Sequence, residues 1–386
     1  MNYDKKVYLR GAYGPGNLGD DVLMVAIINI LSKRFKKKNI YVGVENINKA
    51  RLLDPDVNFV NFKMPIKADL VVYGGGGQFF DFEGKSAKID QTFISKLVNF
   101  IKRNKNPNWA VRRLIYSRNY DCIENLILSK NSATYAVGVG PFDFKGKGWS
   151  RLNSTLAHAG YISVRDDKSL SICQEITSKP IERVADPSFI KGNWATEIST
   201  KNEETQRFDI TIILRDWPYS NDGSALINRL IAYGKGKVSE GKKVRFAFLY
   251  KGYDKETFRQ VENYNTVEYC PSTMKPYEFV QEVINSSDVI ISTRAHGIWL
   301  PVICGKPVIG VQIENKIKQV CNSLPNCTRT ITPATKDIDK VVDDFKNEME
   351  SLTSAISTDI EKNVKLNEIN ESKFLGWVDE IFKNKH

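Results

Sequence analysis

The fold class is decided near the N-terminus, where residues 5–21 read KKVYLRGAYGPGNLGDD. Residues 5–10 are typical of a strand, and the segment that follows them up to Gly19 is rich in glycine. From Asp20 to Lys37 the apolar side chains recur at helical spacing. A strand, a glycine-rich loop and a helix in this order are typical of a parallel α/β sheet. We therefore predict an α/β fold.

The same alternation of strands and helices continues in two series along the chain. In the first series we predict strands at residues 40–44, 69–73, 133–139 and 161–164 and helices at residues 91–101 and 109–128, with one more helix between the last two strands. In the second series we predict strands at residues 209–214, 244–249, 289–292 and 308–311 and helices at residues 225–233, 277–284 and 295–304. Each series is expected to form a Rossmann-like parallel sheet.

A chain of 386 residues exceeds what one hydrophobic core usually organises, so two domains are expected. The polar stretch at residues 196–207 separates the two series and is the candidate linker. We predict a first domain at residues 1–195 and a second at residues 196–335. Residues 336–386 combine charged helix formers with spaced apolar residues and are predicted to pack as helices over one or both domains.

Composition limits the function classes. The chain carries 56 Lys and Arg against 45 Asp and Glu, a formal net charge of +11, which favours polyanions, anionic lipid surfaces or small phosphorylated substrates. No zinc-finger spacing, aromatic RNA-binding motif or basic zipper accompanies this charge, so we expect no nucleic-acid partner. Only three histidines and six scattered cysteines occur, which predicts reduced thiols and no metal site.

The sequence also indicates where the protein works. No apolar stretch approaches the roughly 20 residues of a membrane-spanning helix, and the N-terminus lacks the apolar region of a secretion signal, so we expect a cytoplasmic protein. The predicted helix at residues 109–128 carries Arg112, Arg113 and Arg118 among apolar side chains. Two interpretations stay open: peripheral contact with an anionic inner membrane face, or a packed helix with a basic solvent face.

The glycine-rich loop fits more than one chemistry. Residues 14–19 satisfy the G-x-G-x-x-G pattern of dinucleotide sites, and Glu45 follows the next strand where such a site places its ribose-binding acid. Against a dinucleotide, Pro15 removes an N–H, and the adjacent carboxylates of Asp20 and Asp21 would repel a pyrophosphate. Asp20 either caps the helix or turns its carboxylate to the interdomain cleft, where it accepts a hydroxyl proton. Together with Asn17 it is our candidate for the acceptor side.

A second glycine cluster follows the strand at residues 69–73. Four glycines at residues 74–77 precede Gln78, and consecutive glycines expose backbone N–H groups that suit an anionic or hydroxylated ligand. We assign Gly75, Gly76 and Gln78 to acceptor binding. The alternative is a tight turn without a ligand.

Cationic side chains follow the strands of the second series. Residues 290–297 read IISTRAHG, so Arg294 and His296 converge on a helix N-terminus, a combination that binds phosphate or carboxylate and adds a titratable acid. Arg215 ends the strand at residues 209–214, although a surface ion pair with Asp216 is an alternative, and Lys316 opens a helix. These side chains predict a pocket for a small, highly charged anion.

The order and spacing of these motifs resemble the polysaccharide pyruvyl transferase family. The resemblance covers roughly residues 7–320. The motifs that carry it are Gly16-Asn17-Leu18-Gly19-Asp20, Tyr73–Gln78, Ile162-Ser163-Val164-Arg165-Asp166, Ala185-Asp186-Pro187, Arg215, Arg294-Ala295-His296-Gly297 and Gly305-Lys306-Pro307-Val308-Ile309.

The resemblance implies two Rossmann-like domains facing a cleft, similar to GT-B glycosyltransferases. It implies phosphoenolpyruvate as the donor and a saccharide or lipid-linked saccharide as the acceptor, which receives pyruvate as a cyclic ketal in exopolysaccharide, capsule or cell-wall glycan biosynthesis. Donor contacts are implied for Arg215, Arg294 and His296. Members often have an aromatic-Asp pair before the lysine that corresponds to Lys316, whereas Ile313-Glu314 precedes it here. No cofactor is implied.

The chemistry of the residue types agrees with this donor, since two guanidinium forks and a helix N-terminus match one carboxylate and one phosphate. We expect His296 to protonate the methylene carbon of the donor and Asp20 to take a proton from the attacking hydroxyl. We expect structural roles for Arg165-Asp166 as a helix start and for Asp186-Pro187 as an interdomain corner. A GT-B glycosyltransferase that uses a nucleotide sugar and, less favoured, a dinucleotide oxidoreductase remain the alternatives.

Overall fold

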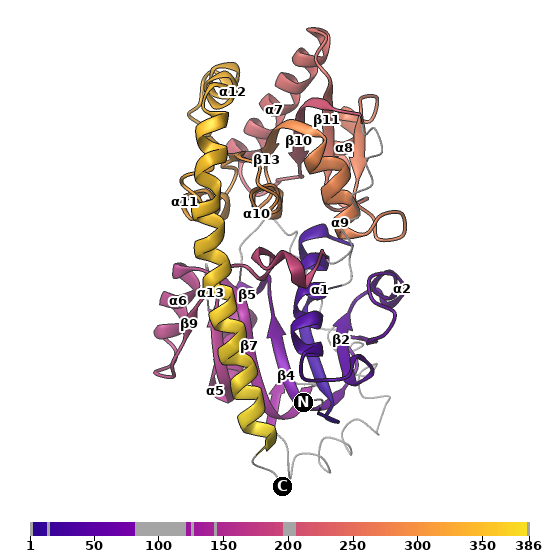
Figure 1. Ribbon diagram of the computed structural model, residues 1–386, viewed down its shortest axis with the longest axis vertical. Coiled ribbons are helices and arrows are strands. Elements are labelled where there is room, and N and C mark those ends of the chain that lie inside the picture. Colours follow the sequence, from indigo (N-terminus) through magenta and orange to yellow (C-terminus); the bar gives the residue numbers. More distant parts are fainter. Residues whose placement is uncertain are drawn as a thin grey trace, which may run out of the picture.

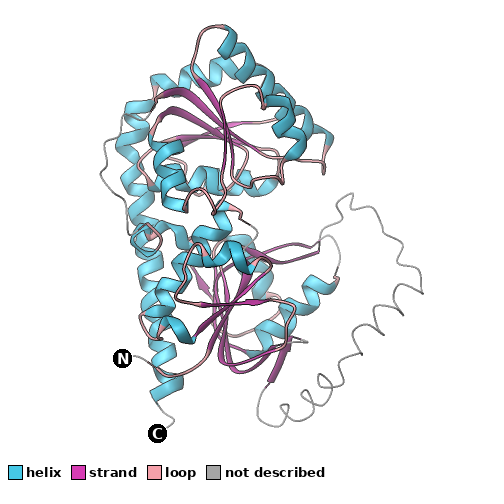
Figure 2. Cartoon of the chain, turned by 90° about the vertical axis from the view of Figure 1, so that its right-hand side faces the viewer, coloured by secondary structure: helices cyan, strands magenta, loops and turns pink. Residues whose placement is uncertain are grey.

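The structure is a computed structural model that describes residues 3–13, 16–81, 121–124, 127–142, 145–195 and 206–383. Two parallel sheets stack one above the other along the long axis of the molecule, and helices cover both faces of each sheet (Figures 1 and 2). The first sheet lies between Val7 and Arg183, and the second lies between Phe208 and Ile331.

The first sheet has nine strands within the described residues, in the order β3-β2-β1-β4-β7-β8-β9, with β5 and β6 also paired to β7. Its strands are β1 (Val7–Tyr13), β2 (Ile40–Val44), β3 (Asn58–Asn61), β4 (Ile66–Gly74), β5 (Gly77–Asp81), β6 (Asp121–Glu124), β7 (Ile127–Phe142), β8 (Ala159–Val164) and β9 (Glu182–Arg183). All pairs are parallel except β6 with β7. The helical segments of this half are α1 (Leu18–Ser32), η1 (Lys37–Asn39), α2 (Ile47–Arg51), α5 (Lys147–His158), α6 (Asp167–Gln174), η2 (Pro187–Phe189) and η3 (Lys191–Asn193).

The second sheet has six parallel strands in the order β12-β11-β10-β13-β14-β15. Its strands are β10 (Phe208–Leu214), β11 (Val244–Phe248), β12 (Thr266–Glu268), β13 (Ser287–Ser292), β14 (Val308–Val311) and β15 (Thr328–Ile331). The helices that connect them are α7 (Asn221–Ser239), α8 (Lys255–Val261), α9 (Pro276–Phe279) with the π-helical turn η4 (Val280–Asn285), α10 (His296–Ile303) and α11 (Asn315–Asn322).

Helix α1 joins the two halves because it is apolar on nearly all sides. Leu18 and Val22 pack into the core of the second sheet, whereas Leu23 and Ile27 pack into a core of the first. A helix that is apolar all round is buried. The first residue of α1 also forms a hydrogen bond between the halves. The Leu18 N–H donates to the carbonyl of Leu249, just after β11, at 2.9 Å. The carboxyl ends of β1 and β11 therefore meet at the interface.

The C-terminal helices tie the halves together from outside. Helix α12 (Ile338–Asn347) leads into the 35-residue helix α13 (Met349–Lys383), which runs along both sheets (Figure 1). Leu352 and Ile356 near its start lie in the core of the second half. Phe374 near its end lies in the core of the first, with its ring 5.0 Å from that of Tyr135.

The predicted α/β fold of two Rossmann-like sheets with C-terminal helices is confirmed. The helix predicted at residues 109–128 is wrong from residue 121 onward, because residues 121–124 form β6 and β7 begins at Ile127. Here the backbone makes hydrogen bonds between strands instead of within a helix. The rest of that prediction, with the arginines of the proposed membrane face, lies outside the described residues, as do the helix predicted at 91–101 and most of the linker. The boundary between residues 195 and 196 stays a prediction. In the part of the chain that the structure covers, no helix combines the length and apolarity needed to cross a bilayer.

Candidate active site

The N-terminus of α1 is capped by Asn17. The side-chain oxygen of Asn17 accepts from the Gly19 N–H at 3.3 Å, and its amide nitrogen donates to Asp20 Oδ2 at 3.0 Å. The interpretation of Asp20 as the cap is therefore wrong, because the residue three positions earlier satisfies the first turn. Asn17 is held by the helix, and it holds the carboxylate of Asp20 in turn.

Asp20 lies half-buried at the junction of the two halves. Burial raises the pKa of its carboxyl above the ordinary value, against the charges of His296 and Lys316, followed by those of Arg165 and Arg294, which act to lower it. His296, Lys316 and Arg294 of the second half and Arg165 of the first thus lie around this acid. Gly76 is also close, since a Cβ added there would lie 3.5 Å from Asp20 Oδ1.

His296 is the first residue of α10, directly after β13, and reaches across to α1. Its ring packs so closely on Gly19 that a Cβ at residue 19 would overlap the imidazole. Nε2 of His296 lies 3.7 Å from Oδ1 of Asp186, and the edge of Trp299 packs against the ring at 5.1 Å between centroids. The imidazole is therefore enclosed between α1 of the first half and the Asp186 carboxylate.

Asp186 is buried and paired with Arg165, whose Nη1 lies 3.2 Å from Oδ2. Burial acts to raise the pKa of Asp186, but the interaction with His296, the charge of Arg165 and a hydrogen bond from Ser188 outweigh it, so the pKa falls well below the ordinary value. An ionised carboxylate in this position can orient and stabilise the protonated imidazole.

The expected structural roles of these motifs are also present. Asp166 caps α6 by accepting from the Ser169 N–H at 2.8 Å, and Asp186 accepts from the Ser188 N–H at 3.2 Å where η2 begins. What the sequence reasoning missed is that Asp186 also faces His296, with Arg165 paired to Asp186 from the other side. A signal existed, since both belong to the motif set that carries the family resemblance.

Arg294 and Arg215 follow the neighbouring strands β13 and β10, and each is paired with an acid of another element. Arg294 Nη2 is ion-paired with Asp254, and Arg215 Nη1 lies 3.1 Å from Glu314 Oε1. Burial, and after it the charge of Arg294, lowers the pKa of Arg215, which indicates that the two guanidinium groups lie close together.

The surface ion pair between Arg215 and Asp216 does not form. The carboxylate of Asp216 instead accepts from the backbone N–H groups of Glu256 at 3.2 Å and Thr257 at 2.8 Å, where it binds the start of α8. The adjacent side chains point to different partners because successive residues at a strand end face opposite sides. Arg215 therefore remains part of the cationic cluster, which consists of Arg215, Arg294, His296 and Lys316.

Three nitrogen atoms of the cluster are buried without a hydrogen-bond partner among the described residues. They are Nε of Arg215, Nε of Arg294 and Nε2 of His296. Buried donors are nearly always satisfied in folded proteins, so an unsatisfied group calls for a specific explanation. An anionic ligand at the carboxyl ends of β10 and β13 would supply acceptors for the two guanidinium nitrogens, whereas Nε2 of His296 lies toward the Asp186 carboxylate.

Lys316, the second residue of α11, adds a further cation. Its side chain is exposed to solvent, and charged groups of both halves act on it. Desolvation by the surrounding protein, then the charge of Arg165, lowers the pKa of Lys316 to about 8, with Arg215 acting in the same direction and Glu314 and Asp20 against it. The predicted cationic residues are thus brought together, opposite Asp20.

The glycine cluster after β4 forms a closed turn. Gly75 and Gly76 have φ angles of +57° and +68°, which favour glycine. The Gly75 N–H donates to the Tyr135 carbonyl at 2.9 Å, and Nε2 of Gln78 donates to the carbonyls of Gly74 at 3.1 Å and Gly75 at 2.9 Å. The predicted row of exposed N–H groups is wrong at Gly75, because β7 takes its hydrogen bond. Gly76 lies next to Asp20, as described above, while Gln78 lies at a neighbouring cavity.

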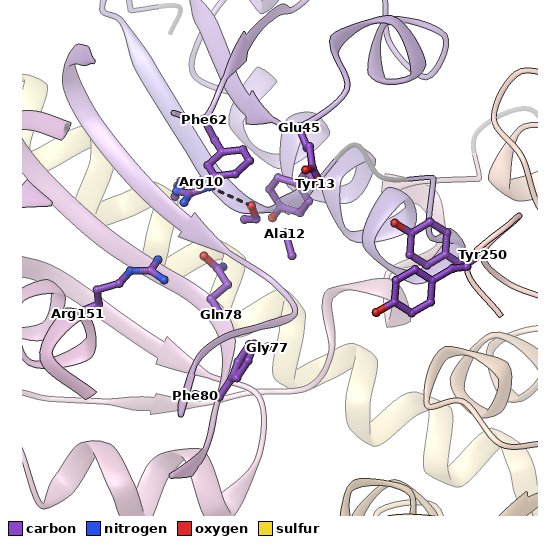
Figure 3. A pocket seen from close by; sticks show the side chains of 12 residues that line it. Arg10, Ala12, Tyr13, Glu45, Phe62, Gly77, Gln78, Phe80, Arg151 and Tyr250 are labelled. Atoms are coloured by element: carbon purple, nitrogen blue, oxygen red, sulfur yellow. Dashed lines mark hydrogen bonds between the residues drawn. The ribbon is translucent and has the colours of Figure 1, made fainter. Parts of the chain in front are cut away.

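That cavity has a volume of about 380 Å³ and lies between the halves (Figure 3). Most of its lining comes from the carboxyl ends of β1 and β2 and from β5, and two tyrosines come from the segment after β11. Its lining residues are Arg10, Gly11, Ala12, Tyr13, Glu45, Phe62, Gly77, Gln78, Phe80, Arg151, Tyr250 and Tyr253.

Solved structures of other proteins share the fold at low sequence identity. The structure of HepE from Anabaena in complex with UDP-glucose is 12% identical, with a TM-score of 0.55 over 96% of this chain and 100% of that one. A putative UDP-N-acetylglucosamine 2-epimerase from Listeria monocytogenes is 9% identical, with a TM-score of 0.59 over 99% of this chain and 98% of that one. UDP-GlcNAc 2-epimerase from Methanocaldococcus jannaschii is 12% identical, with a TM-score of 0.53 over 88% of this chain and 92% of that one. These likenesses show a shared GT-B-like fold.

The sequence matches no curated protein. It does match the family described as polysaccharide pyruvyl transferase over residues 17–315, a range that begins at the cap of α1 and ends at the start of α11. This range contains Asp20, Asp186, Arg215 and His296, and the match extends over well more than half of the chain. The chain therefore belongs to the polysaccharide pyruvyl transferase family.

Proposed function

We propose that the protein transfers the pyruvyl group of phosphoenolpyruvate to a saccharide, as a cyclic ketal, in the synthesis of an exopolysaccharide, capsule or cell-wall glycan. The observation that carries this proposal is the pair of buried, unsatisfied guanidinium nitrogens on Arg215 and Arg294, with His296 on the same strand-to-helix segment as Arg294, opposite Asp20. The donors suit an anion, and the acid suits a hydroxyl. A saccharide acceptor agrees with the family to which the chain belongs, and the anionic donor is part of the proposal.

Phosphoenolpyruvate fits the second half of the protein by charge. It carries one carboxylate and one phosphate, and the two guanidinium groups at the ends of β10 and β13 provide planar donor pairs for such oxygens. Lys316 and the N-terminus of α10 add positive potential. The ion pairs to Asp254 and Glu314 hold the guanidinium groups in place before the donor binds.

The reaction begins with proton transfer to the donor. His296 gives its proton to the methylene carbon of phosphoenolpyruvate, which makes the adjacent C2 electrophilic. A sugar hydroxyl attacks C2, and its proton passes to Asp20, whose raised pKa suits a general base. Asp186, 3.7 Å from the imidazole, holds the ring in position and stabilises its protonated form.

The second half of the reaction exchanges phosphate for a second hydroxyl. The bond between C2 and the phosphate oxygen breaks, with the departing charge stabilised by Arg215 and Arg294. A second hydroxyl of the same sugar attacks C2, and its proton leaves with the phosphate, while the proton taken up by Asp20 returns to His296 through solvent and restores both residues. One phosphoenolpyruvate and two hydroxyls thus yield one ketal and one inorganic phosphate. No cofactor or metal ion is used in these steps.

We place the enzyme in the cytoplasm, where phosphoenolpyruvate is made, with peripheral contact to the membrane if the acceptor is lipid-linked. The rival function is glycosyl transfer from a nucleotide sugar, which the GT-B-like fold also accommodates. The two functions differ in the donor, since one consumes phosphoenolpyruvate and the other releases a nucleoside diphosphate.

The test is phosphate release from phosphoenolpyruvate in the presence and absence of saccharides extracted from the producing cells. We expect release that requires the saccharide, and a new acid-labile carboxyl group on the glycan. In parallel, UDP-glucose and related nucleotide sugars are offered as donors. Consumption of a nucleotide sugar, with phosphoenolpyruvate left intact, would replace the proposal by glycosyl transfer.

A further inference from the structure

The interdomain cavity adjoins the proposed reaction centre. Tyr13 lines the cavity, and its hydroxyl is hydrogen-bonded to the Gly74 carbonyl at the turn that lies against Asp20. Burial, then the charges of Asp20 and Asp186, raises the pKa of Tyr13, which agrees with a position between the cavity and the two acids. A sugar whose hydroxyl lies at Asp20 would therefore continue into this cavity.

Aromatic side chains line the cavity from both halves of the protein. Phe80 on β5 and Tyr253 after β11 are 53% and 60% exposed, unusual values for large apolar side chains. Tyr253 stacks on Tyr250 with centroids 4.6 Å apart and planes 2° apart. Phe62 lies under the guanidinium of Arg10, with 4.8 Å between them. Exposed rings around a cavity indicate a ligand with flat apolar faces.

Polar groups complete the lining. Figure 3 shows Gln78 and Arg151 pointing toward the same space, with Glu45 near Tyr13. A few polar groups among aromatic rings are typical of a small-molecule site, because the rings supply contact area and the polar groups fix orientation. Sugar rings match this lining, since each has C–H faces for the aromatic rings and hydroxyls around its edge.

We propose that this cavity binds the part of the acceptor glycan next to the sugar that receives pyruvate, so that the acceptor has at least two sugar rings. The inference rests on the proposed function, because Asp20 defines where the reacting hydroxyl lies. The volume of about 380 Å³ lies at the lower end of small-molecule sites and has room for about two sugar rings. Phe80 and Tyr253 are assigned to stacking on the second ring.

Two other ligands, phosphoenolpyruvate and a nucleotide, have to be compared with a sugar as the ligand of this cavity. Phosphoenolpyruvate is a small anion with several charges, and the buried donors that suit its oxygens belong to Arg215 and Arg294, neither of which lines the cavity. A uridine ring, by contrast, could stack on Tyr253 as a sugar does. Nucleotide binding is therefore the alternative that the experiment has to distinguish.

The experiment measures binding of the full chain to arrayed saccharides of one, two and three rings, built from glucose, galactose, mannose and N-acetylhexosamines, with phosphoenolpyruvate present. We expect at least tenfold tighter binding of the best two-ring saccharide than of its single rings. Phe80→Ala and Tyr253→Ala should each weaken two-ring binding by about 3- to 10-fold, and Tyr253→Phe should retain it. Both side chains are exposed, so folding is not at risk. Met64→Ala, at a 61% exposed position outside the cavity lining, is the matched control.

Donor binding is measured separately on the same samples by stabilisation with phosphoenolpyruvate. If phosphoenolpyruvate stabilises all variants but single rings bind as well as pairs, no saccharide binds, or the alanine variants bind like the wild type, the cavity assignment is overturned and the proposed function stands. If Tyr253→Ala instead abolishes binding of uridine diphosphate, the cavity is a nucleotide site and the inference is also overturned. If phosphoenolpyruvate does not bind at all, the proposed function fails first.

Discussion

The two walls of the interdomain cleft are built in different ways. On the wall of the second half, Arg215 and Arg294 stand at strand ends and are each paired with an acid, yet each keeps one buried donor unsatisfied. On the wall of the first half, the glycine turn is closed by a hydrogen bond to β7 and by hydrogen bonds from the side chain of Gln78. Asp20 is the acid that this wall presents to the cations of the other.

The difference teaches how one cleft can serve two unlike substrates. A wall with unsatisfied cationic donors recognises an anion by charge, and this recognition is strong and directional. A wall of closed backbone, beside a cavity lined with aromatic rings from both halves, recognises a ligand by shape and by dispersed hydrogen bonds. On the proposed function, the first is the phosphoenolpyruvate wall and the second is the glycan wall. Variants on each wall should therefore affect different kinetic constants.

The largest effect is expected where the walls meet. His296→Gln and Asp20→Asn should each lower kcat by about 100- to 10,000-fold, because each removes a group that transfers a proton. The KM for phosphoenolpyruvate should change little in Asp20→Asn, since this residue belongs to the other wall. The measurement is steady-state phosphate release. His158→Gln, at an exposed position, is the control. Near-normal kcat in His296→Gln would remove the acid assignment.

The donor wall itself is tested by Arg294→Ala and Arg215→Ala. Each should weaken phosphoenolpyruvate binding by about 10- to 100-fold, because each removes charged hydrogen bonds, which contribute about 1.5–3 kcal/mol. Isothermal titration calorimetry with phosphoenolpyruvate measures the Kd. Arg207→Ala, a 74% exposed arginine paired with Asp288 where β10 begins, should bind like the wild type. Equal weakening in all three would show that only net charge matters.

A smaller effect sharpens the comparison by pH. Since its pKa is about 8, Lys316 is charged at pH 7 and loses its charge as the pH rises toward 9. The KM for phosphoenolpyruvate should therefore rise over this range in the wild type. Lys316→Arg stays charged and should show a flatter profile, whereas Lys316→Met should have the high KM at every pH. A rise of the same size in all three would assign the titration to another group.

The smallest effect concerns stability at the junction. Asp21 is buried beside Asp20 and accepts a hydrogen bond from Tyr269 of the second half at 2.9 Å. Burial raises the pKa of Asp21 to about 8, against the Tyr269 hydrogen bond. In the unfolded chain this carboxyl titrates near its ordinary value of about 3.9.

Between about pH 4 and about pH 8, the carboxyl of Asp21 is therefore protonated in the folded state and ionised in the unfolded state. The stability from the neutral carboxyl is fully present below about pH 4 and is lost as the pH rises to about 8. Asp21→Asn stays neutral, so its thermal midpoint should rise relative to that of the wild type between pH 5 and 8. Thermal unfolding across this range measures the difference. Parallel curves would mean that Asp21 is ionised in the folded protein.

Much of the donor wall could be predicted from the sequence because its residues follow local patterns. Strand periodicity followed by Arg294 and His296, or by Arg215, places these side chains at strand ends, and strand ends of parallel sheets meet at one edge. The pairing of the arginines could not be predicted, because Asp254 and Glu314 come from distant elements. The alternative ion pair between Arg215 and the adjacent Asp216 is wrong because Asp216 also has a distant partner, the start of α8.

The glycan wall was harder to predict. Sequence rules allow either Asn17 or Asp20 to cap α1, and only the backbone geometry shows that Asn17 does so. The glycine run shows that a turn occurs but not that β7 takes up its hydrogen bonds. The aromatic lining of the cavity joins Phe80 of this wall to Tyr250 and Tyr253 of the second half, about 170 residues later in the chain, and no local pattern links them.

The central claim is that phosphoenolpyruvate binds at His296 on the wall of the second half. The chain has only three histidines, so a sample labelled with ¹⁵N-histidine gives few ring signals, and His296→Gln assigns the one that matters. On titration with phosphoenolpyruvate, we predict that the His296 signal moves in a saturable manner, that the His158 signal stays in place, and that Arg294→Ala weakens the response. If the His296 signal stays in place with phosphoenolpyruvate but moves with UDP-glucose, the account of the donor is contradicted.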